Sequence, residues 1–358
     1  MGVARAIGLI GVGLAALVWL IPAAPMTGDG QHYIEFVRNG LQHGASSWHE
    51  RRVLGPLLVR AMPLDAQDGF FVLTTVSLAL TSLLTYLAAR PLVGEARAMP
   101  AIPLLFGTWL VAPNLREFGL VDPLAWVFVA GVWLATVRRR WWLAATLATF
   151  GVLAKEVVAL AALAAAAAAF DRRHAWRAAA VAGPALAMLL ALTLVFPGSG
   201  TDAGAYLLKW LKDGLFSNGI GRAAFLFFAS YGALWLLLPR GLGELPDHLK
   251  RAAAVYVLAA LALPAVGSPE RMEEAIFPLV ISAALLATRR WTLLLVWVLA
   301  VSGALFAARV GGDARLPTAV AWSGLVLGCG LAVGSYALSG RVPELLRAGP
   351  RGTTAPSP

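Results

Sequence analysis

The chain has 358 residues, of which 59% are hydrophobic and 13% charged, and its formal net charge is +10. A soluble domain carries about 25% charged residues, and the mean hydropathy of this chain is +0.74. So apolar a chain has no way to cover itself with polar surface in water, which excludes a soluble globular protein and predicts an integral membrane protein. The basic residues stand in short clusters between apolar runs, which excludes a continuous nucleic-acid-binding patch.

The first predicted membrane helix covers residues 4–26, close to the roughly 20 residues that a span needs. The alternative is a secretory signal, and the length of the apolar run favours a retained helix. A polar stretch, 27–67, follows as the first outer loop. Further apolar runs that predict membrane helices lie at 69–89, 99–114, 120–137, 176–196, 221–239, 250–267, 273–288, 290–310 and 316–338.

The apolar run 141–170 lies between two arginine clusters, Arg138–Arg140 and Arg172–Arg173. Arginine clusters mark cytoplasmic loops, and both clusters share that side only if the run enters and leaves on one face. We therefore expect a short helical hairpin whose turn contains Lys155 and Glu156. The alternative is one long tilted helix with a buried Lys–Glu pair.

Taken together, the runs predict an all-α, polytopic transmembrane helical bundle of about 12 membrane segments, the hairpin included. Residues 1–340 are expected to form a single transmembrane catalytic domain with both chain termini in the cytoplasm. Residues 341–358 are expected to form a disordered cytoplasmic tail.

The first outer loop is expected to contain two interfacial helices, because Tyr33, Ile34 and Val37 share one helical face and VLGPLLVRAMPL (53–64) is apolar. Asp29 lies just before the first of these helices, a position that suits a helix N-cap as well as a catalytic carboxylate. The histidines His32, His43 and His49 match no zinc spacing, so structural or substrate-binding roles are favoured over a metal site.

This topology also gathers acids and bases on the outer face, as a polar active site needs. Such residues come from the first loop, the loop after residue 114, the hairpin turn and the segment before residue 273. The candidates are Asp29, Gln31, His32, Tyr33, Arg51, Arg52, Glu117, Asp122, Lys155, Glu156, Glu270 and Arg271.

Several of these stretches resemble the GT-C superfamily of polytopic membrane glycosyltransferases. They are DGQHY (29–33), HERRVLGPL (49–57), EFGLVDPLA (117–125), LAKE (153–156) and ERMEEAIFPL (270–279). The resemblance implies a polyprenyl-phosphate-linked sugar donor and a glycan, lipid or protein acceptor. It also implies an active site on the outer face of a bacterial cytoplasmic membrane. Many members carry two acids close together in the first loop, whereas Gly30 and Gln31 follow Asp29 here. No metal site is therefore assigned, and a divalent metal stays open as a cofactor.

On this resemblance, Asp29 is the expected general base. Arg51, Arg52, Lys155 and Arg271 are expected to bind the donor phosphate, because cations stabilise a departing phosphate. The expected substrate-binding residues are Gln31, His32, Tyr33, Glu117, Asp122, Glu156 and Glu270.

Simpler roles compete with these assignments. Arg51 and Arg52 suit lipid phosphates, Asp122 before a proline suits a helix start, and Glu270 suits the first turn of a helix. Lys155 and Glu156 are harder to explain in this way, because sequence neighbours point apart on a helix and do not neutralise each other. For the whole chain, the alternative function is a polytopic transporter or a flippase for a lipid-linked substrate.

Overall fold

The computed structural model describes residues 2–26, 28–40, 50–196, 220–262 and 273–347, and every regular element within these ranges is helical. The longer helices are α1 (Gly2–Leu20), α2 (Gly28–Asn39), α5 (Ala66–Val93), α9 (Asp122–Val137), α10 (Trp141–Val152), α11 (Val158–Ala169), α12 (Trp176–Val195), α14 (Ile220–Tyr231), α15 (Leu234–Glu244), α16 (Asp247–Ala262), α18 (Phe277–Ala287), α19 (Leu293–Gly312) and α20 (Thr318–Arg347). The shorter ones are α4 (Leu54–Arg60), α6 (Glu95–Ala98), α7 (Ala101–Phe106), α8 (Val111–Arg116) and the 3-10 turns η1 (Arg172–His174) and η4 (Glu273–Ile276).

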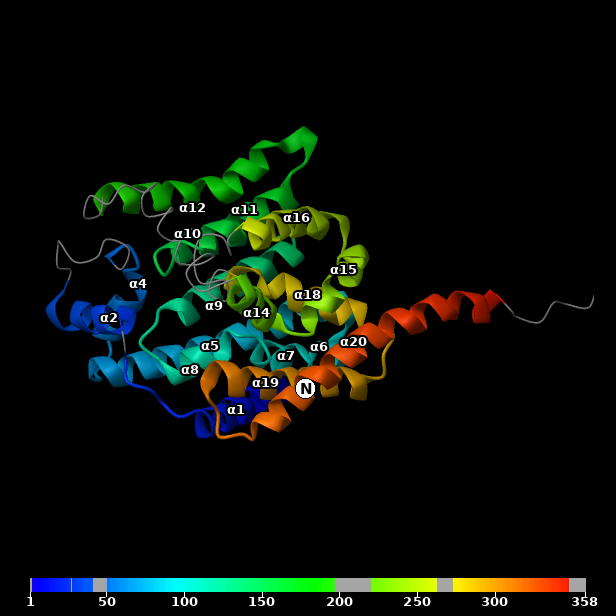
Figure 1. Ribbon diagram of the computed structural model, residues 1–358. Helices are drawn as coiled ribbons and strands as arrows, with labels where there is room; N and C mark the ends of the chain where they lie inside the picture. The colour runs from blue at the N-terminus through cyan, green and yellow to red at the C-terminus, as the bar shows by residue number, and fades with distance from the viewer. Residues whose placement is uncertain (1, 27, 41–49, 197–219, 263–272, 348–358) are drawn as a thin grey trace, which may run out of the picture.

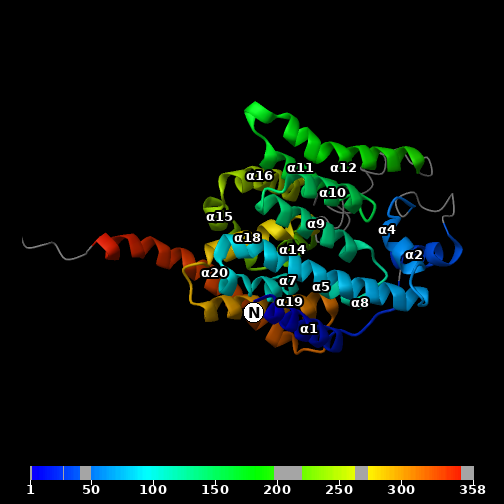
Figure 2. The same ribbon diagram turned by 180° about the vertical axis from the view of Figure 1, so that it is seen from behind.

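The long helices lie side by side as a bundle (Figure 1). Helices α1, α19 and α20 lie on one side, α5, α9 and α18 in the middle, and α12 on the opposite side, beyond α10, α11 and α16 (Figure 1 and Figure 2). α5 packs along α9 at the centre. Burial of large side chains such as Phe70, Trp126 and Trp133 holds this centre together, and the Trp133 indole Nε1 donates a hydrogen bond to Ser282 Oγ at 3.0 Å.

Among the described residues, five helices are long and apolar enough to cross a membrane: α1, α5, α12, α19 and the first part of α20. The bent pair α14 and α15 makes a sixth if it is taken as one span. Large apolar side chains point outward from these helices, and Val12, Leu194 and Leu294 are 71%, 71% and 72% exposed. The described residues therefore form a helical bundle suited to a bilayer, with fewer full-length spans than the predicted number of segments.

Prolines explain why two predicted spans are shorter than expected. α1 ends at Leu20, ahead of Pro22 and Pro25, so the predicted span 4–26 loses its last turn. The predicted span 99–114 divides into α7 and α8. The division leaves Pro113 in the first turn of α8, where a missing backbone N–H breaks no helical hydrogen bond.

The predicted span 221–239 is a bent pair of helices. α14 and α15 meet at an angle of 61°, and Gly232 between them has a φ of 51°, which glycine adopts without strain. Trp235 covers the bend. Its Nε1 donates a hydrogen bond to the Phe227 carbonyl at 2.9 Å, and its ring stacks on the Phe227 ring with the centroids 4.6 Å apart.

The last helix is longer than the sequence predicts. α20 begins at Thr318 and continues to Arg347, and its final turns extend beyond the other helices (Figure 1). Residues 341–347, which the sequence assigned to a disordered tail, are therefore the last residues of this helix. Residues 348–358 lie outside the described residues.

The segment 141–170 is two helices, α10 and α11, which pack against each other. Residues 153–157 join them, and Lys155 and Glu156 lie in this turn. The backbone N–H of Leu54 donates to the carbonyl of Leu153 at 3.0 Å, so the turn lies against α4. The turn, α2 and α4 thus mark one end of the bundle, called here the α2–α4 end.

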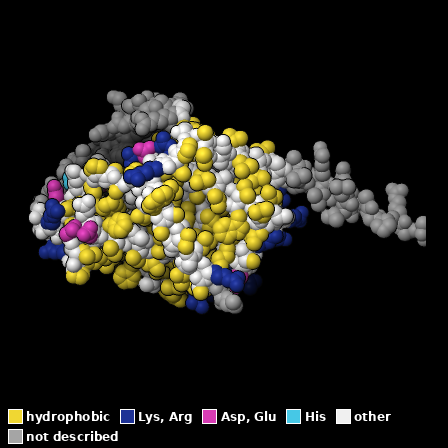
Figure 3. Space-filling model, turned by 90° about the horizontal axis from the view of Figure 1, so that it is seen from below, with side chains coloured by type: hydrophobic (Ala, Val, Ile, Leu, Met, Phe, Trp, Pro, Cys, Tyr) yellow, Lys and Arg dark blue, Asp and Glu magenta, His cyan; other side chains and the backbone are white. Residues whose placement is uncertain are grey.

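Charged side chains are concentrated toward the two ends of the bundle, and the surface between them is mostly apolar (Figure 3). The arginine-rich end lies opposite the α2–α4 end, where α9, α11 and α18 finish. Its acids are paired: Arg90 Nη2 lies 3.0 Å from Glu95 Oε2, and Arg289 Nη1 lies 3.6 Å from Glu244 Oε2.

Gly241 allows α15 to approach α18, and its replacement tests this packing. A Cβ at Gly241 would lie 2.0 Å from the Ala283 carbonyl oxygen, whereas a Cβ at Gly243 on the same helix meets nothing within 4 Å. Gly241→Ala should destabilise the protein by about 1–3 kcal/mol through overpacking. Gly243→Ala should be neutral or stabilising by up to about 1 kcal/mol. Thermal unfolding in detergent measures both, and equal stability of the two variants would contradict this account of the α15–α18 contact.

Candidate functional site

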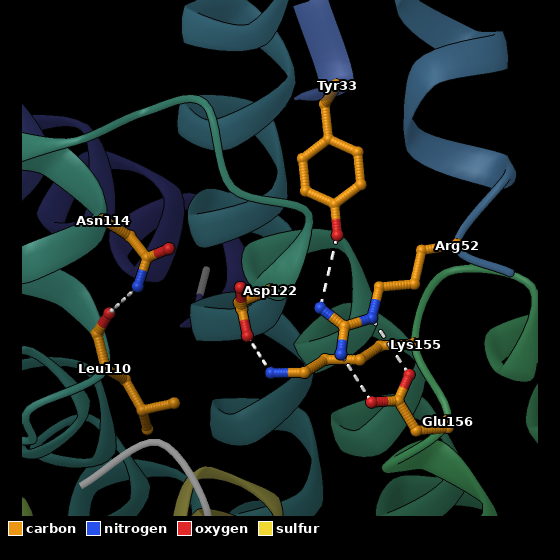
Figure 4. A network of polar contacts seen from close by, with 7 residues as sticks. All are labelled: Tyr33, Arg52, Leu110, Asn114, Asp122, Lys155 and Glu156. Atoms are coloured by element: carbon orange, nitrogen blue, oxygen red, sulfur yellow. Dashed lines mark hydrogen bonds and ion pairs between the residues drawn. The ribbon is translucent and has the colours of Figure 1, made fainter. Parts of the chain in front are cut away.

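A chain of polar contacts joins α2, α4 and the hairpin turn at the α2–α4 end (Figure 4). Arg52, just before α4, donates from Nε to Glu156 Oε2 at 3.0 Å and from Nη2 to Glu156 Oε1 at 2.6 Å. Its third nitrogen, Nη1, donates to the Tyr33 hydroxyl oxygen at 3.2 Å. The guanidinium therefore uses both edges, one for a carboxylate and one for a phenol, which fixes its orientation.

A second ion pair joins the same turn to α9. Lys155 Nζ donates to Asp122 Oδ1, at the first residue of α9. Asp122 is 1% exposed and Lys155 is 6% exposed, so neither charge has water as an alternative partner. Such a buried charge is stable only when it is paired, and the pair therefore fixes the start of α9 against the turn.

The two neighbouring residues of the turn thus reach different parts of the chain. Lys155 bonds to α9 and Glu156 to the residue before α4, consistent with the expectation that they do not neutralise each other. Figure 4 shows Lys155 directed toward Asp122 and Glu156 directed toward Arg52. Ion pairs therefore hold α9 and the segment before α4 at the hairpin turn, and the Arg52–Tyr33 hydrogen bond adds α2.

Burial and charge act on the pKa values of this cluster in opposite directions. Burial raises the pKa of the Tyr33 hydroxyl far above its ordinary value, and the charge of Arg52 only partly offsets this. Burial also acts to raise the pKa of Glu156, but the charge and hydrogen bonds of Arg52 outweigh it and hold that pKa below its ordinary value. Tyr33 is therefore neutral and Glu156 ionised near neutral pH.

Arg51 has a different environment from Arg52. Its Nε and Nη2 donate to the backbone carbonyl of Phe196, at 3.1 and 3.0 Å. Phe196 follows the last residue of α12, so Arg51 ties that helix end to α4. The acceptor is a neutral carbonyl oxygen, which attracts a guanidinium less strongly than an anionic oxygen does.

Three other predicted residues lie in the first turns of α2. Asp29 is half-buried, and its charge adds a small contribution to the raised pKa of Tyr33 on the same helix. Gln31 and His32 are exposed. Gln31 Nε2 donates to the Met26 carbonyl at 3.1 Å, and His32 Nδ1 lies 4.0 Å from Glu35 Oε2.

The loop after α8 approaches α2 closely. A Cβ on Gly30 would lie 3.3 Å from the Gly119 Cα, so the glycines leave room for the two backbones to meet. Glu117, half-buried at the end of α8, begins this loop.

Asn114 on α8 is a buried amide that the sequence analysis did not select as a site residue. Its Nδ2 donates to the Leu110 carbonyl at 3.0 Å, and its Oδ1 has no hydrogen-bond partner. A polar side chain within an apolar run was the available signal.

Some predicted positions cannot be placed. Glu270, Arg271, His43 and His49 lie outside the described residues. Within the described ranges, no three His, Cys, Asp or Glu side chains come together as a candidate metal site.

No protein-family model, curated protein or solved structure matches the chain. A functional assignment therefore has to be argued from the residues of the site.

Breaking the buried Lys155–Asp122 pair should strongly destabilise the protein. Lys155→Met removes one member of the buried ion pair with Asp122, and breaking such a pair typically costs about 3–5 kcal/mol. The double variant Lys155→Met/Asp122→Leu should regain most of this loss, because it removes both charges.

Thermal unfolding in detergent provides the measurement, with Lys250→Met as the matched control. Lys250 Nζ lies 3.6 Å from Asp247 Oδ1 in an exposed pair, and such pairs contribute only about 0–1 kcal/mol. A Lys155→Met protein as stable as Lys250→Met would show that the buried pair does not hold α9 in place.

The lowered pKa of Glu156 predicts a pH dependence of stability. A carboxyl group whose pKa is lower in the folded state stabilises the protein above its unfolded-state pKa, and this contribution is lost as pH falls through the folded-state pKa. Acidification below about pH 4.5 should therefore destabilise wild type more than Glu156→Gln, which lacks the titrating group. Parallel unfolding curves at pH 7 and pH 3 measure the difference, and an equal loss in both proteins would refute the prediction.

Proposed function

We propose that this protein is a membrane glycosyltransferase of the GT-C type. In this proposal it transfers a sugar from a polyprenyl-phosphate carrier to a glycan, lipid or protein acceptor. The bundle then comprises about 12 membrane segments, with the short helices α10 and α11 counted among them.

The observation that carries the proposal is the charged cluster at the α2–α4 end. Tyr33, Arg52, Glu156, Lys155 and Asp122 come from four separate stretches of the chain and meet beside the helix that carries Asp29. A bundle embedded in lipid gains nothing from buried charges as such, since apolar side chains of similar size are often as stable. A rigid, charged frame next to a half-buried carboxylate does suit a polar reaction.

The distribution of basic residues supports an orientation for this site. Arginines predominate at the opposite end of the bundle, and such residues mark the cytoplasmic side of bacterial membrane proteins. The α2–α4 end then faces the outer side of the cytoplasmic membrane, and both chain termini lie in the cytoplasm. Polyprenyl-phosphate sugars presented on the outer face would reach the cluster from the surrounding lipid.

In the proposed reaction an acceptor hydroxyl oxygen attacks the anomeric carbon of the sugar. A glycosidic bond forms as the bond from the anomeric carbon to the phosphate oxygen breaks, and that oxygen leaves with the electron pair as polyprenyl phosphate. Asp29 accepts the proton of the hydroxyl. Its half-buried position in the first turn of α2 keeps it within reach of an acceptor.

The departing phosphate needs a cation, and Arg51 is the first candidate. The half-buried Arg51 guanidinium would meet two phosphate oxygens at once through its planar fork. Arg52 and Lys155, which the sequence also suggested as phosphate ligands, are bonded to Glu156 and Asp122. We assign these four residues, with the buried Tyr33, to holding Arg51 and α2 in place.

Asp29→Asn tests the assignment of the base. Loss of a general base typically lowers the rate about 10²–10⁴-fold. The assay measures sugar transfer in membranes supplied with polyprenyl-phosphate hexoses and pentoses. Asp68→Asn is the matched control, since Asp68 is an exposed acid in the first turn of α5 and should keep the wild-type rate. An Asp29→Asn protein as active as wild type would remove Asp29 from the reaction.

The same preparation separates this proposal from the transporter alternative. In sealed vesicles, a glycosyltransferase produces a new covalent sugar–acceptor bond, which mass spectrometry detects. Movement of the lipid-linked sugar across the vesicle membrane with no covalent change would instead support transport.

A further inference from the structure

One surface at the arginine-rich end combines basic side chains from three parts of the chain. We call it the arginine surface, and it is formed by the turn between α9 and α10, the turn between α11 and α12, and the start of α16. Its basic members are Arg138, Arg139, Arg140, Arg172, Arg173, Arg177 and Arg251.

Contacts between elements make this surface continuous. Arg139 Nη2 lies 3.4 Å from His248 Nδ1, which joins the α9–α10 turn to α16. Arg251 donates from Nε to the Ala167 carbonyl at 3.1 Å and from Nη2 to the Ala168 carbonyl at 3.0 Å, which joins α16 to the end of α11. The cations are therefore held side by side on three packed elements.

The charge of the arginine surface is not neutralised within the described part of the chain. Its two acids already have partners: Asp171 Oδ2 lies 3.0 Å from His174 Nδ1, and Asp247 Oδ1 lies 3.6 Å from Lys250 Nζ. Among the described residues, no carboxylate comes within ion-pair distance of the seven arginines. Burial, followed by the charges of Arg139 and Arg251, lowers the pKa of His248, so this imidazole is neutral at neutral pH and the arginines supply the charge.

Exposed tryptophans flank these arginines. Trp142 follows the α9–α10 turn and is 70% exposed, and Trp176 begins α12 and is 58% exposed. The Arg177 guanidinium carbon lies 5.9 Å from the centre of the Trp176 ring. Exposed tryptophans in membrane proteins lie at the level of the lipid headgroups, which places the arginines beside the headgroup phosphates.

We propose that the arginine surface binds the headgroups of anionic phospholipids in the adjacent leaflet. The negative phosphate diesters supply the counter-charge that the described residues lack at this surface, and the guanidinium groups can each meet two phosphate oxygens. This inference is independent of the glycosyltransferase proposal, because it concerns the opposite end of the bundle.

The test measures binding of a soluble short-chain phosphatidylglycerol to the full-length protein in neutral detergent at low salt. The variant Arg138→Gln/Arg140→Gln/Arg172→Gln removes three exposed side chains that form no hydrogen bond or ion pair with the described residues. At about 1 kcal/mol for each basic residue near a lipid surface, Kd should rise about 100-fold. The lysine variant Arg138→Lys/Arg140→Lys/Arg172→Lys keeps the charge and should retain most of the affinity.

The matched control, Arg38→Gln/Arg60→Gln/Arg315→Gln, removes three exposed arginines from the α2–α4 end and should bind like wild type. Phosphatidylcholine, which has no net charge, should bind weakly to every variant. Unchanged affinity in the first glutamine variant, or an equal loss in the control, would overturn the proposal. So would displacement of phosphatidylglycerol by equimolar inorganic phosphate, which would identify a site for the free anion instead. If the first glutamine variant does not fold, the lysine variant is the test. It should retain most of the affinity for phosphatidylglycerol, and loss of binding in this variant would contradict a charge-based headgroup site.

Discussion

The arrangement of this protein at its α2–α4 end depends on how two adjacent charges, Lys155 and Glu156, are accommodated inside an apolar bundle. Removing an ion from water costs several kcal/mol even after the surroundings relax, so each charge requires a partner of opposite sign. Asp122 supplies one partner and Arg52 the other. Because the two charges belong to consecutive residues, a single short turn sets the positions of α9 and of the segment that leads into α4.

The ion pairs add little net stability to the protein, and their effect is to fix the positions of side chains in the cluster. Charges that are exchanged for apolar groups often leave a protein as stable as before, whereas breaking one member of a pair is costly. The pairs therefore act as positional restraints. They fix Arg52 against the hairpin turn, and Arg52 in turn holds α2 there through its hydrogen bond to Tyr33.

The sequence was sufficient for the class of fold and for the approximate location of the charged cluster. Hydropathy predicted the helices, and the arginine clusters on either side of 141–170 indicated two helices with Lys155 and Glu156 between them. It was not sufficient for the pairings. Arg52 and Glu156 are 104 positions apart and Asp122 and Lys155 are 33 apart, so helix packing decides which cation meets which carboxylate.

The lengths of the helices could not be predicted from hydropathy either. Hydropathy averages over a window and takes no account of a proline that ends α1 or of the division between α7 and α8. The sequence placed Tyr33 on the apolar face of α2, where it is buried. It did not predict that the Tyr33 hydroxyl accepts a hydrogen bond from Arg52.

The elbow between α14 and α15 interrupts the candidate span that these two helices form together. A helix that breaks within hydrocarbon leaves peptide groups without partners, and such groups draw in water unless protein covers them. Trp235 provides that cover, with its indole nitrogen bonded to the Phe227 carbonyl and its ring packed flat on the Phe227 ring. Trp235 thus pairs one carbonyl beside the bend and packs against it, so the chain changes direction by 61° with the indole bracing the inside of the elbow.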